Sequence, residues 1–291
     1  MVRKSIMSPV MLSAAITMLV SCNDKITPTG SDVPTDAPAD VPMEITFHAS
    51  HDIYSKTVLN DETVLWESGD KVKILWGDNR SYESSVQTYN SSANAELNAE
   101  VDAASAYYGV YPYSAQSSLA DGNLTVKIPE NQTGLFADAG ITVAKADKEN
   151  NMKFKHVVSY IEFTIDRTGT LTISGGHPLN GDITVTEFKE TGTPEYYVSE
   201  NTSSVTLDIK ASGTYYVAIL PDAEFDYLLL TLVENGETYS ALSTNGISMK
   251  PGKLLALGNV TGRFKVGNAV GATLEPFEIV DFSFESNGIS F

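Results

Sequence analysis

The stretch WESGDKVKILW, residues 66–76, decides the fold class of this chain. An apolar run ends at Trp66, and the Ser-Gly-Asp that follows one residue later has the composition of a polar turn. After the turn, apolar side chains recur at every second position, at Val72, Ile74 and Trp76. This is the period of a half-buried β-strand, so the stretch predicts a turn leading into a strand, with both tryptophans in the core.

The same alternation continues on both sides of this stretch. Runs rich in β-branched and aromatic residues are separated by Gly, Asn, Asp and Pro, at intervals typical of β-sandwiches. The predicted strands span residues 44–49, 72–76, 107–111, 123–128, 160–165, 171–174, 182–188, 205–209, 215–220, 227–233 and 254–260. The best helical candidate, 93–106, carries small apolar residues that would bury little. We therefore predict an all-β fold of antiparallel β-sandwiches.

The predicted strands fall into two groups. A polar, charged passage at 145–153 separates them, so we expect an N-terminal β-sandwich domain over 44–150 and a C-terminal one over 151–266. A last segment, 267–291, lies beyond the final regular strand and has an alternation of its own.

The N-terminus has the pattern of a secretory signal. Arg3 and Lys4 precede an apolar core of roughly eleven residues, which is too short to span a bilayer and suits a signal peptide over 1–21. The sequence Leu-Val-Ser-Cys that ends at Cys22 resembles the bacterial lipobox, in which the cysteine thiol is alkylated by diacylglycerol before the chain is cut. Cys22 is the only cysteine of the chain, and we predict that it carries the lipid, palmitate included, that anchors a bacterial cell-surface lipoprotein.

Residues 22–43 have the composition of a tether. Proline, threonine, serine and aspartate dominate this segment, and large apolar side chains are almost absent, so it cannot form a core. We expect it to hold the folded part away from the membrane.

The charge and the cysteine count exclude several classes of protein. The chain has 37 acidic and 19 basic residues, a formal charge of −18, which excludes nucleic acid as a partner. A single cysteine that is used for lipid leaves none for disulfides, thiolate metal sites or a cysteine nucleophile. The acidity itself is explained by a solvated surface and names no partner.

Nothing in the sequence indicates an enzyme, a cofactor or a metal site. The four histidines form no recognised metal-binding spacing, and no nucleotide-binding or hydrolase motif is present. His48 and His51 would form a metal pair on a helix, but in a strand they face opposite sides. Asp121-Gly122-Asn123 has residues that could touch calcium, and it also has the composition of a hairpin turn, which is the favoured interpretation. We therefore predict no catalytic residue.

Six landmarks, taken in order along the chain, are similar to those of the fimbrillin-like family. This family includes the major and minor pilins of lipoprotein-derived pili in some anaerobic two-membrane bacteria. The landmarks are the lipobox, Ile45–Ala49 with Lys56-Thr57, Trp66–Val72, Tyr107–Pro112, Phe154–Ser159 and Tyr215–Pro221. The resemblance implies two tandem transthyretin-like sandwiches without enzymatic activity.

The resemblance also implies how such a chain assembles. In the family a protease removes the lipidated N-terminus with the first strand, and the groove accepts a strand from another subunit. Lys56 is the only Lys or Arg between Ile26 and Asp70, so the candidate cut lies between Lys56 and Thr57. The family is typically cut after arginine, and the alternative is that Lys56 is a solvated residue in a loop. The implied partners are neighbouring pilin subunits, the outer membrane through the lipid, and a host protein or glycan.

The C-terminal segment is the candidate donor strand. Its apolar side chains, Val280, Phe282 and Phe284, alternate with polar ones, and Ile289 and Phe291 continue the alternation after a predicted Asn-Gly turn. Pairing within its own domain explains the same pattern equally well. The predicted function is a structural subunit or accessory component of a surface fimbrium that serves adhesion. The alternative is a non-polymerising surface lipoprotein that binds a glycan or a host protein.

Overall fold

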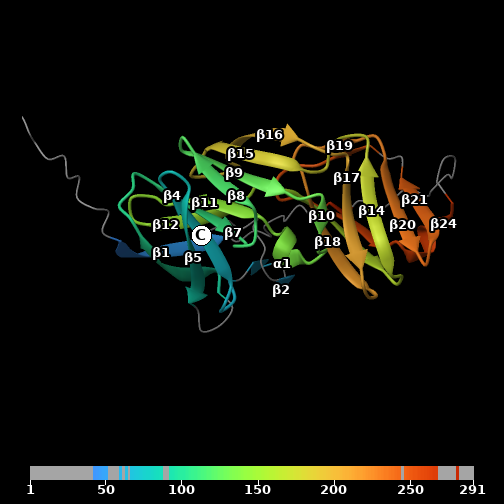
Figure 1. Ribbon diagram of the computed structural model, residues 1–291, viewed down its shortest axis with the longest axis horizontal. Helices are drawn as coiled ribbons and strands as arrows, with labels where there is room; N and C mark the ends of the chain where they lie inside the picture. The colour runs from blue at the N-terminus through green and yellow to red at the C-terminus, as the bar shows by residue number, and fades with distance from the viewer. Residues whose placement is uncertain are drawn as a thin grey trace, which may run out of the picture. The chain divides into compact units, whose positions relative to one another are not determined.

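The computed structural model describes residues 42–51, 59–60, 63–64, 66–87, 92–243, 246–267 and 280–281. Most of these residues are in β-strands, which confirms the predicted all-β class (Figure 1). Helical structure among them is limited to α1 (Phe136–Ala139) and a 3-10 turn at Thr261–Arg263.

The first strands close into a barrel with the order β1-β12-β11-β7-β4-β5-β6. Their bounds are β1 Met43–His51, β4 Lys71–Trp76, β5 Arg80–Gln87, β6 Asn94–Val101, β7 Tyr107–Tyr111, β11 Thr142–Lys145 and β12 Asn151–His156. The barrel closes through a parallel pair between β1 and β12, while β1 and β6 run antiparallel. A closed barrel leaves no free edge strand, whereas an open sandwich sheet has two.

Two further sheets form a sandwich in the second half of the chain. One has the order β10-β17-β14-β20-β21-β24, and the other β18-β13-β23-β25. The first comprises β10 Asn131–Gln132, β14 Gly169–Gly175, β17 Ser204–Ile209, β20 Leu228–Glu234, β21 Glu237–Ser243 and β24 Lys265–Val266. The second comprises β13 Ser159–Ile165, β18 Gly213–Ile219, β23 Leu254–Asn259 and β25 Val280–Asp281.

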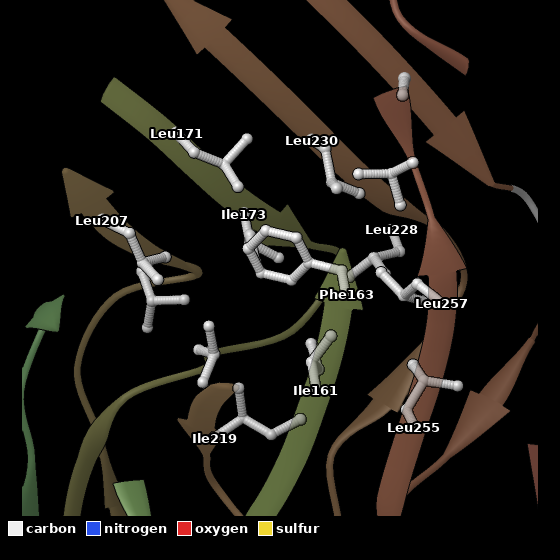
Figure 2. Close-up of a cluster of buried hydrophobic side chains, with 14 of the residues drawn as sticks. Ile161, Phe163, Leu171, Ile173, Leu207, Ile219, Leu228, Leu230, Leu255 and Leu257 are labelled. Carbon is white, nitrogen blue, oxygen red and sulfur yellow. The ribbon is translucent and has the colours of Figure 1, made fainter. Parts of the chain in front are cut away.

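The core of this sandwich comes from the inward positions of both sheets. Figure 2 shows Phe163 of β13 between leucines and isoleucines of the facing strands. Phe163, Ile173 and Leu230 have no solvent exposure. Burial of such side chains at every second position is what the sequence alternation predicts.

A fourth sheet, β16-β15-β9-β8, packs its buried face on a second core. Its strands are β8 Ser117–Ala120, β9 Asn123–Ile128, β15 Gly181–Glu187 and β16 Glu195–Glu200. This core also takes side chains from the barrel, such as Leu75 and Val110, and from the strands of the sandwich, such as Tyr160. Short pairs complete the described strands: β2 Leu59–Asn60 with β3 Thr63–Val64, and β19 Glu224–Phe225 with β22 Ile247–Ser248.

Strand pairs join segments on either side of residue 150. β12, which begins at Asn151, pairs with β1 and β11 of the barrel, and β15 pairs with β9. The Nζ of Lys155 donates to the carbonyl oxygens of Lys189 and Gly192, at 2.5 and 2.9 Å, and so ties the β15–β16 connection to the barrel. The described residues from Pro42 to Asp281 belong to one compact unit. The division into domains at 44–150, 151–266 and 267–291 stays a prediction.

Candidate assembly site

Strand β1 lies between two neighbours in the barrel (Figure 1). It pairs antiparallel with β6 over Met43–Ser50 and parallel with β12 over His48–His51. Its side chains alternate, so that Phe47 and Ala49 are buried while Thr46 and His48 are exposed. Removal of β1 would therefore leave the sides of β6 and β12 that face it without a hydrogen-bonding partner.

The buried side chains of β1 fill the barrel interior. Phe47 has no solvent exposure, lies opposite Leu97 of β6, and its ring meets that of Tyr107 edge-on with centroids 5.4 Å apart. Ala49 lies opposite Met152 of β12, which is also fully buried. The space that β1 occupies thus accepts a large aromatic side chain and, two residues later, a small one.

Trp66 and the turn after it stabilise the core of the barrel. The backbone of Trp66 exchanges hydrogen bonds with Ser92 at 2.7 and 3.0 Å, and the fully buried indole meets Phe154 edge-on at 5.2 Å. The Asp70 carboxylate accepts from the backbone N–H of Glu67 at 2.9 Å and from the Tyr111 hydroxyl at 3.3 Å. Burial raises the pKa of Asp70 above its ordinary value. The predicted turn and the core position of Trp66 are both confirmed.

His51 ends β1 with its ring turned inward. The imidazole stacks on the Trp66 indole, with centroids 3.9 Å apart and an interplanar angle of 28°. Both ring nitrogens of His51, and the Nε1 of Trp66, are buried without a hydrogen-bond partner among the described residues. Burial, and secondly the charge of His156, lower the pKa of His51 to about 3. His48 is exposed on the other face, as predicted for two histidines three residues apart in a strand.

The C-terminal candidate strand is described at two residues. Val280 and Asp281 form β25, which pairs antiparallel with Ala256 and Leu255 of β23 in the chain's own sheet. The other predicted donor residues, Phe282, Phe284, Ile289 and Phe291, lie outside the described residues. So do the predicted lipidation site, Cys22, and the predicted cleavage site, Lys56 and Thr57.

The Asp121-Gly122-Asn123 stretch has a structural role. Asp121 and Gly122, with φ of 50° and 76°, form the turn between β8 and β9, so the hairpin interpretation is confirmed. Among the residues that the structure describes, no three His, Cys, Asp or Glu side chains gather closely enough to hold a metal ion. The described part of the chain also contains no helix with the length and apolar character required to span a bilayer.

Several solved structures match this chain over most of its length and nearly all of their own. A proposed cell adhesion protein from Bacteroides ovatus ATCC 8483 is 14% identical with a TM-score of 0.48, and the match covers 82% of this chain and 99% of that one. Another from Bacteroides uniformis ATCC 8492 is 16% identical with a TM-score of 0.46, covering 84% and 99%. A fimbrial assembly protein from Parabacteroides distasonis ATCC 8503 is 13% identical with a TM-score of 0.33, covering 81% and 100%.

No curated protein matches the chain. The sequence model of the fimbrillin-like family matches residues 55–276, which is more than half of the chain. The chain therefore belongs to the fimbrillin-like family.

Proposed function

We propose that this protein is a structural subunit or accessory component of a cell-surface pilus that assembles by β-strand donation and serves adhesion. Its precursor is an outer-membrane lipoprotein, anchored through Cys22. Its partners are neighbouring pilin subunits, with a host protein or glycan as the target of adhesion. Membership of the fimbrillin-like family supports this role.

The observation that carries the proposal is the place of β1 between β6 and β12. A cut between Lys56 and Thr57 would separate residues 22–56, β1 included, from the rest of the chain. The departure of β1 would open a groove with a deep aromatic site at Phe47 and unpaired main-chain groups on both sides. An incoming strand can pair with both edges and fill the apolar sites, which is the physical basis of β-augmentation.

The donated strand is the C-terminal segment of a neighbour, with Val280, Phe282 and Phe284 on its apolar face and Ile289 and Phe291 beyond the turn. In this structure Val280 and Asp281 pair with the chain's own β23 over two register pairs. Among the residues that the structure describes, donation gives up this two-residue pairing, and β23 keeps its longer pairing with β13.

A reversible lock on β1 tests the proposal. Thr46 and Asn98 face each other in the β1–β6 register, and the Thr46 hydroxyl donates to the Asn98 side-chain oxygen at 2.8 Å. The double variant Thr46→Cys, Asn98→Cys is expected to form a disulfide that keeps β1 in the barrel after cleavage. The cleaved, oxidised protein should give no SDS-resistant ladder, and reduction should restore the ladder together with release of the fragment that ends at Lys56.

A matched lock serves as the control. Thr164 and Thr214 face each other in the β13–β18 register with hydroxyl oxygens 2.9 Å apart, away from β1. The variant Thr164→Cys, Thr214→Cys should assemble equally well when oxidised and when reduced. A ladder from the oxidised Thr46/Asn98 variant would contradict assembly through departure of β1.

Lipidation is tested at Cys22. Cys22→Ala is expected to abolish incorporation of labelled fatty acid and to leave the unprocessed precursor, because the thiol is the acceptor. A diacylglycerol supplies two chains, each adding about 0.8 kcal/mol per buried CH₂, so the wild type should stay with membranes. Cys22→Ser, which keeps the size of the side chain, should fail in the same way. Normal uptake of label by either variant would rule out this anchor.

A further inference from the structure

We propose that His51 is an acid-sensitive latch that holds the C-terminal end of β1 in the barrel. The latch consists of the His51 imidazole and the three aromatic side chains around it, Trp66, Tyr111 and Phe154. When the imidazole takes up a proton, the seated position of the strand end becomes unfavourable and the strand opens.

The first ground is the contact geometry of the His51 ring. One face of the ring stacks on Trp66 at 3.9 Å, while Tyr111 and Phe154 lie at centroid distances of 6.3 and 6.0 Å, at 78° and 55°. These three residues come from different parts of the barrel: the turn before β4, the end of β7, and β12. Besides its pairing with β6 and β12, the end of β1 is therefore held by aromatic packing around one polar ring.

The second ground is the absence of an acceptor for a protonated ring. Nδ1 and Nε2 of His51 are both buried without a hydrogen-bond partner among the described residues. An imidazolium has two N–H groups, and each of them needs a hydrogen-bond acceptor. A buried charge without hydrogen bonds is strongly disfavoured, because it loses its hydration and no hydrogen bond replaces it. The aromatic faces offer a cation some attraction, but this recovers only a part of that loss.

The third ground is the arrangement of the other charged and titratable groups around the latch. From β12, His156 adds a repulsive charge as the second cause that lowers the pKa of His51. From the turn, the Asp70 carboxylate is bonded to the Tyr111 hydroxyl and to the Glu67 N–H, not to His51. The Tyr111 hydroxyl donates a hydrogen bond to Asp70, and burial raises the pKa of Tyr111, so its side chain stays neutral. None of these groups stabilises a proton on His51.

The direction of the pH effect follows from these facts. The pKa of His51 is lowered to about 3 in the seated state, from an ordinary value of 6.5 once the ring reaches water. The free energy that favours the seated position of the β1 end is therefore fully present above pH 6.5. It decreases as the pH falls from 6.5 towards 3. With these two values the equilibrium constant for opening rises about 25-fold between pH 7 and pH 5.

The significance of the latch for assembly rests on the proposed function, because β1 is the strand that has to leave. A mildly acidic surrounding would favour its departure at the end that leads to Lys56. The opening itself is a property of the folded chain and can be measured without any assembly.

Amide hydrogen exchange of the full-length protein tests the latch. Between pH 7 and pH 5, the protection of Phe47 to His51, corrected for the intrinsic exchange rate, should fall about 25-fold. The protection of β14, in the sandwich, should not show this fall. His51→Phe keeps an aromatic ring on Trp66 and cannot take up a proton, so the acid response of β1 should disappear. His48→Gln, on the exposed face of the same strand, should retain it.

Three results would overturn the proposal. One is a β1 response that persists unchanged in His51→Phe or, if that variant does not fold, in His51→Leu. Another is wild-type protection of β1 that is the same at pH 7 and pH 5. The third, which needs no variant, is an NMR titration that places the pKa of His51 near 6.5. If β1 opens in acid but the locked and unlocked proteins assemble alike, the latch stands and the proposed route of assembly fails.

Discussion

Phe47→Ala is expected to destabilise the uncleaved protein by about 3–5 kcal/mol, the cost of truncating a fully buried phenylalanine. The side chain fills the barrel between Leu97 and Tyr107, and a cavity there cannot collapse easily because β1 is held on both sides by strand pairing. At this size the loss corresponds to a fall of roughly 6–20 °C in the unfolding temperature. Calorimetry of the full-length variant against wild type measures it.

His48→Ala is the matched control for this change. His48 is the next residue of the same strand and is exposed, so its truncation should change the free energy of unfolding by less than about 0.5 kcal/mol. Equal effects of the two substitutions would mean that β1 does not bury its inner face in solution. Once the protein is cut after Lys56 and β1 has left, Phe47→Ala should no longer affect stability, which separates the precursor from the mature form.

Deletion of residues 277–291 is expected to abolish the ladder of the surface protein while leaving the fold nearly unchanged. The described contact of this segment with its own sheet is limited to Val280 and Asp281 on β23. The sandwich core depends instead on residues such as Phe163, Ile173 and Leu230. Thermal unfolding and the SDS-resistant ladder, measured on the same preparation, check both parts of this expectation.

Phe282→Asp should give the same result as the deletion, because a carboxylate would have to enter the apolar groove that β1 leaves. Ser283→Asp, on the polar face of the same segment, is the matched control and should still assemble. A sharp fall in unfolding temperature on deletion would instead assign the segment to its own sandwich. An unchanged ladder in the deletion variant would exclude it as the donor.

Strand positions could be predicted from the sequence because each face of a strand has a distinct environment. The predicted segments 107–111 and 123–128 coincide with β7 and β9. Burial alternates along β9, whereas β7 is buried at four successive positions and was recognisable from its aromatic and β-branched residues and the proline that follows it. The best helical candidate, 93–106, contains β6, in which Ala95, Leu97, Ala99 and Val101 are buried at alternate positions. Small apolar side chains at these positions suit the inside of a barrel. The sequence prediction that a helix over 93–106 would bury little agrees with the strand found there.

The pairing of the strands could not be predicted in the same way. Side chains alternate between the two faces in the same way in parallel and in antiparallel pairs. The expectation of purely antiparallel sandwiches was therefore wrong at three pairs, which are parallel: β1 with β12, β10 with β17, and β13 with β23. Closure of the barrel also depends on which distant strands meet, which no local pattern encodes.

The site was predictable only in part. Alternation placed His48 and His51 on opposite faces, and composition placed Trp66 in the core. The stacking of His51 on Trp66 joins two residues that belong to different predicted elements, so the signal for it in the sequence is weak. An inward histidine at the end of an otherwise apolar strand face is the one feature that could have identified it.

The parallel pair between β1 and β12 has a kinetic consequence. It joins residues about 100 apart, such as Ser50 and Lys153, so the barrel cannot close until the chain up to β12 is available. Contacts of such long range slow folding, because the entropy of a large loop is lost before the contact forms. Sheets with near-neighbour pairs, such as β4 with β5 and β8 with β9, can form earlier. The first strand to emerge is therefore expected to be among the last to be seated.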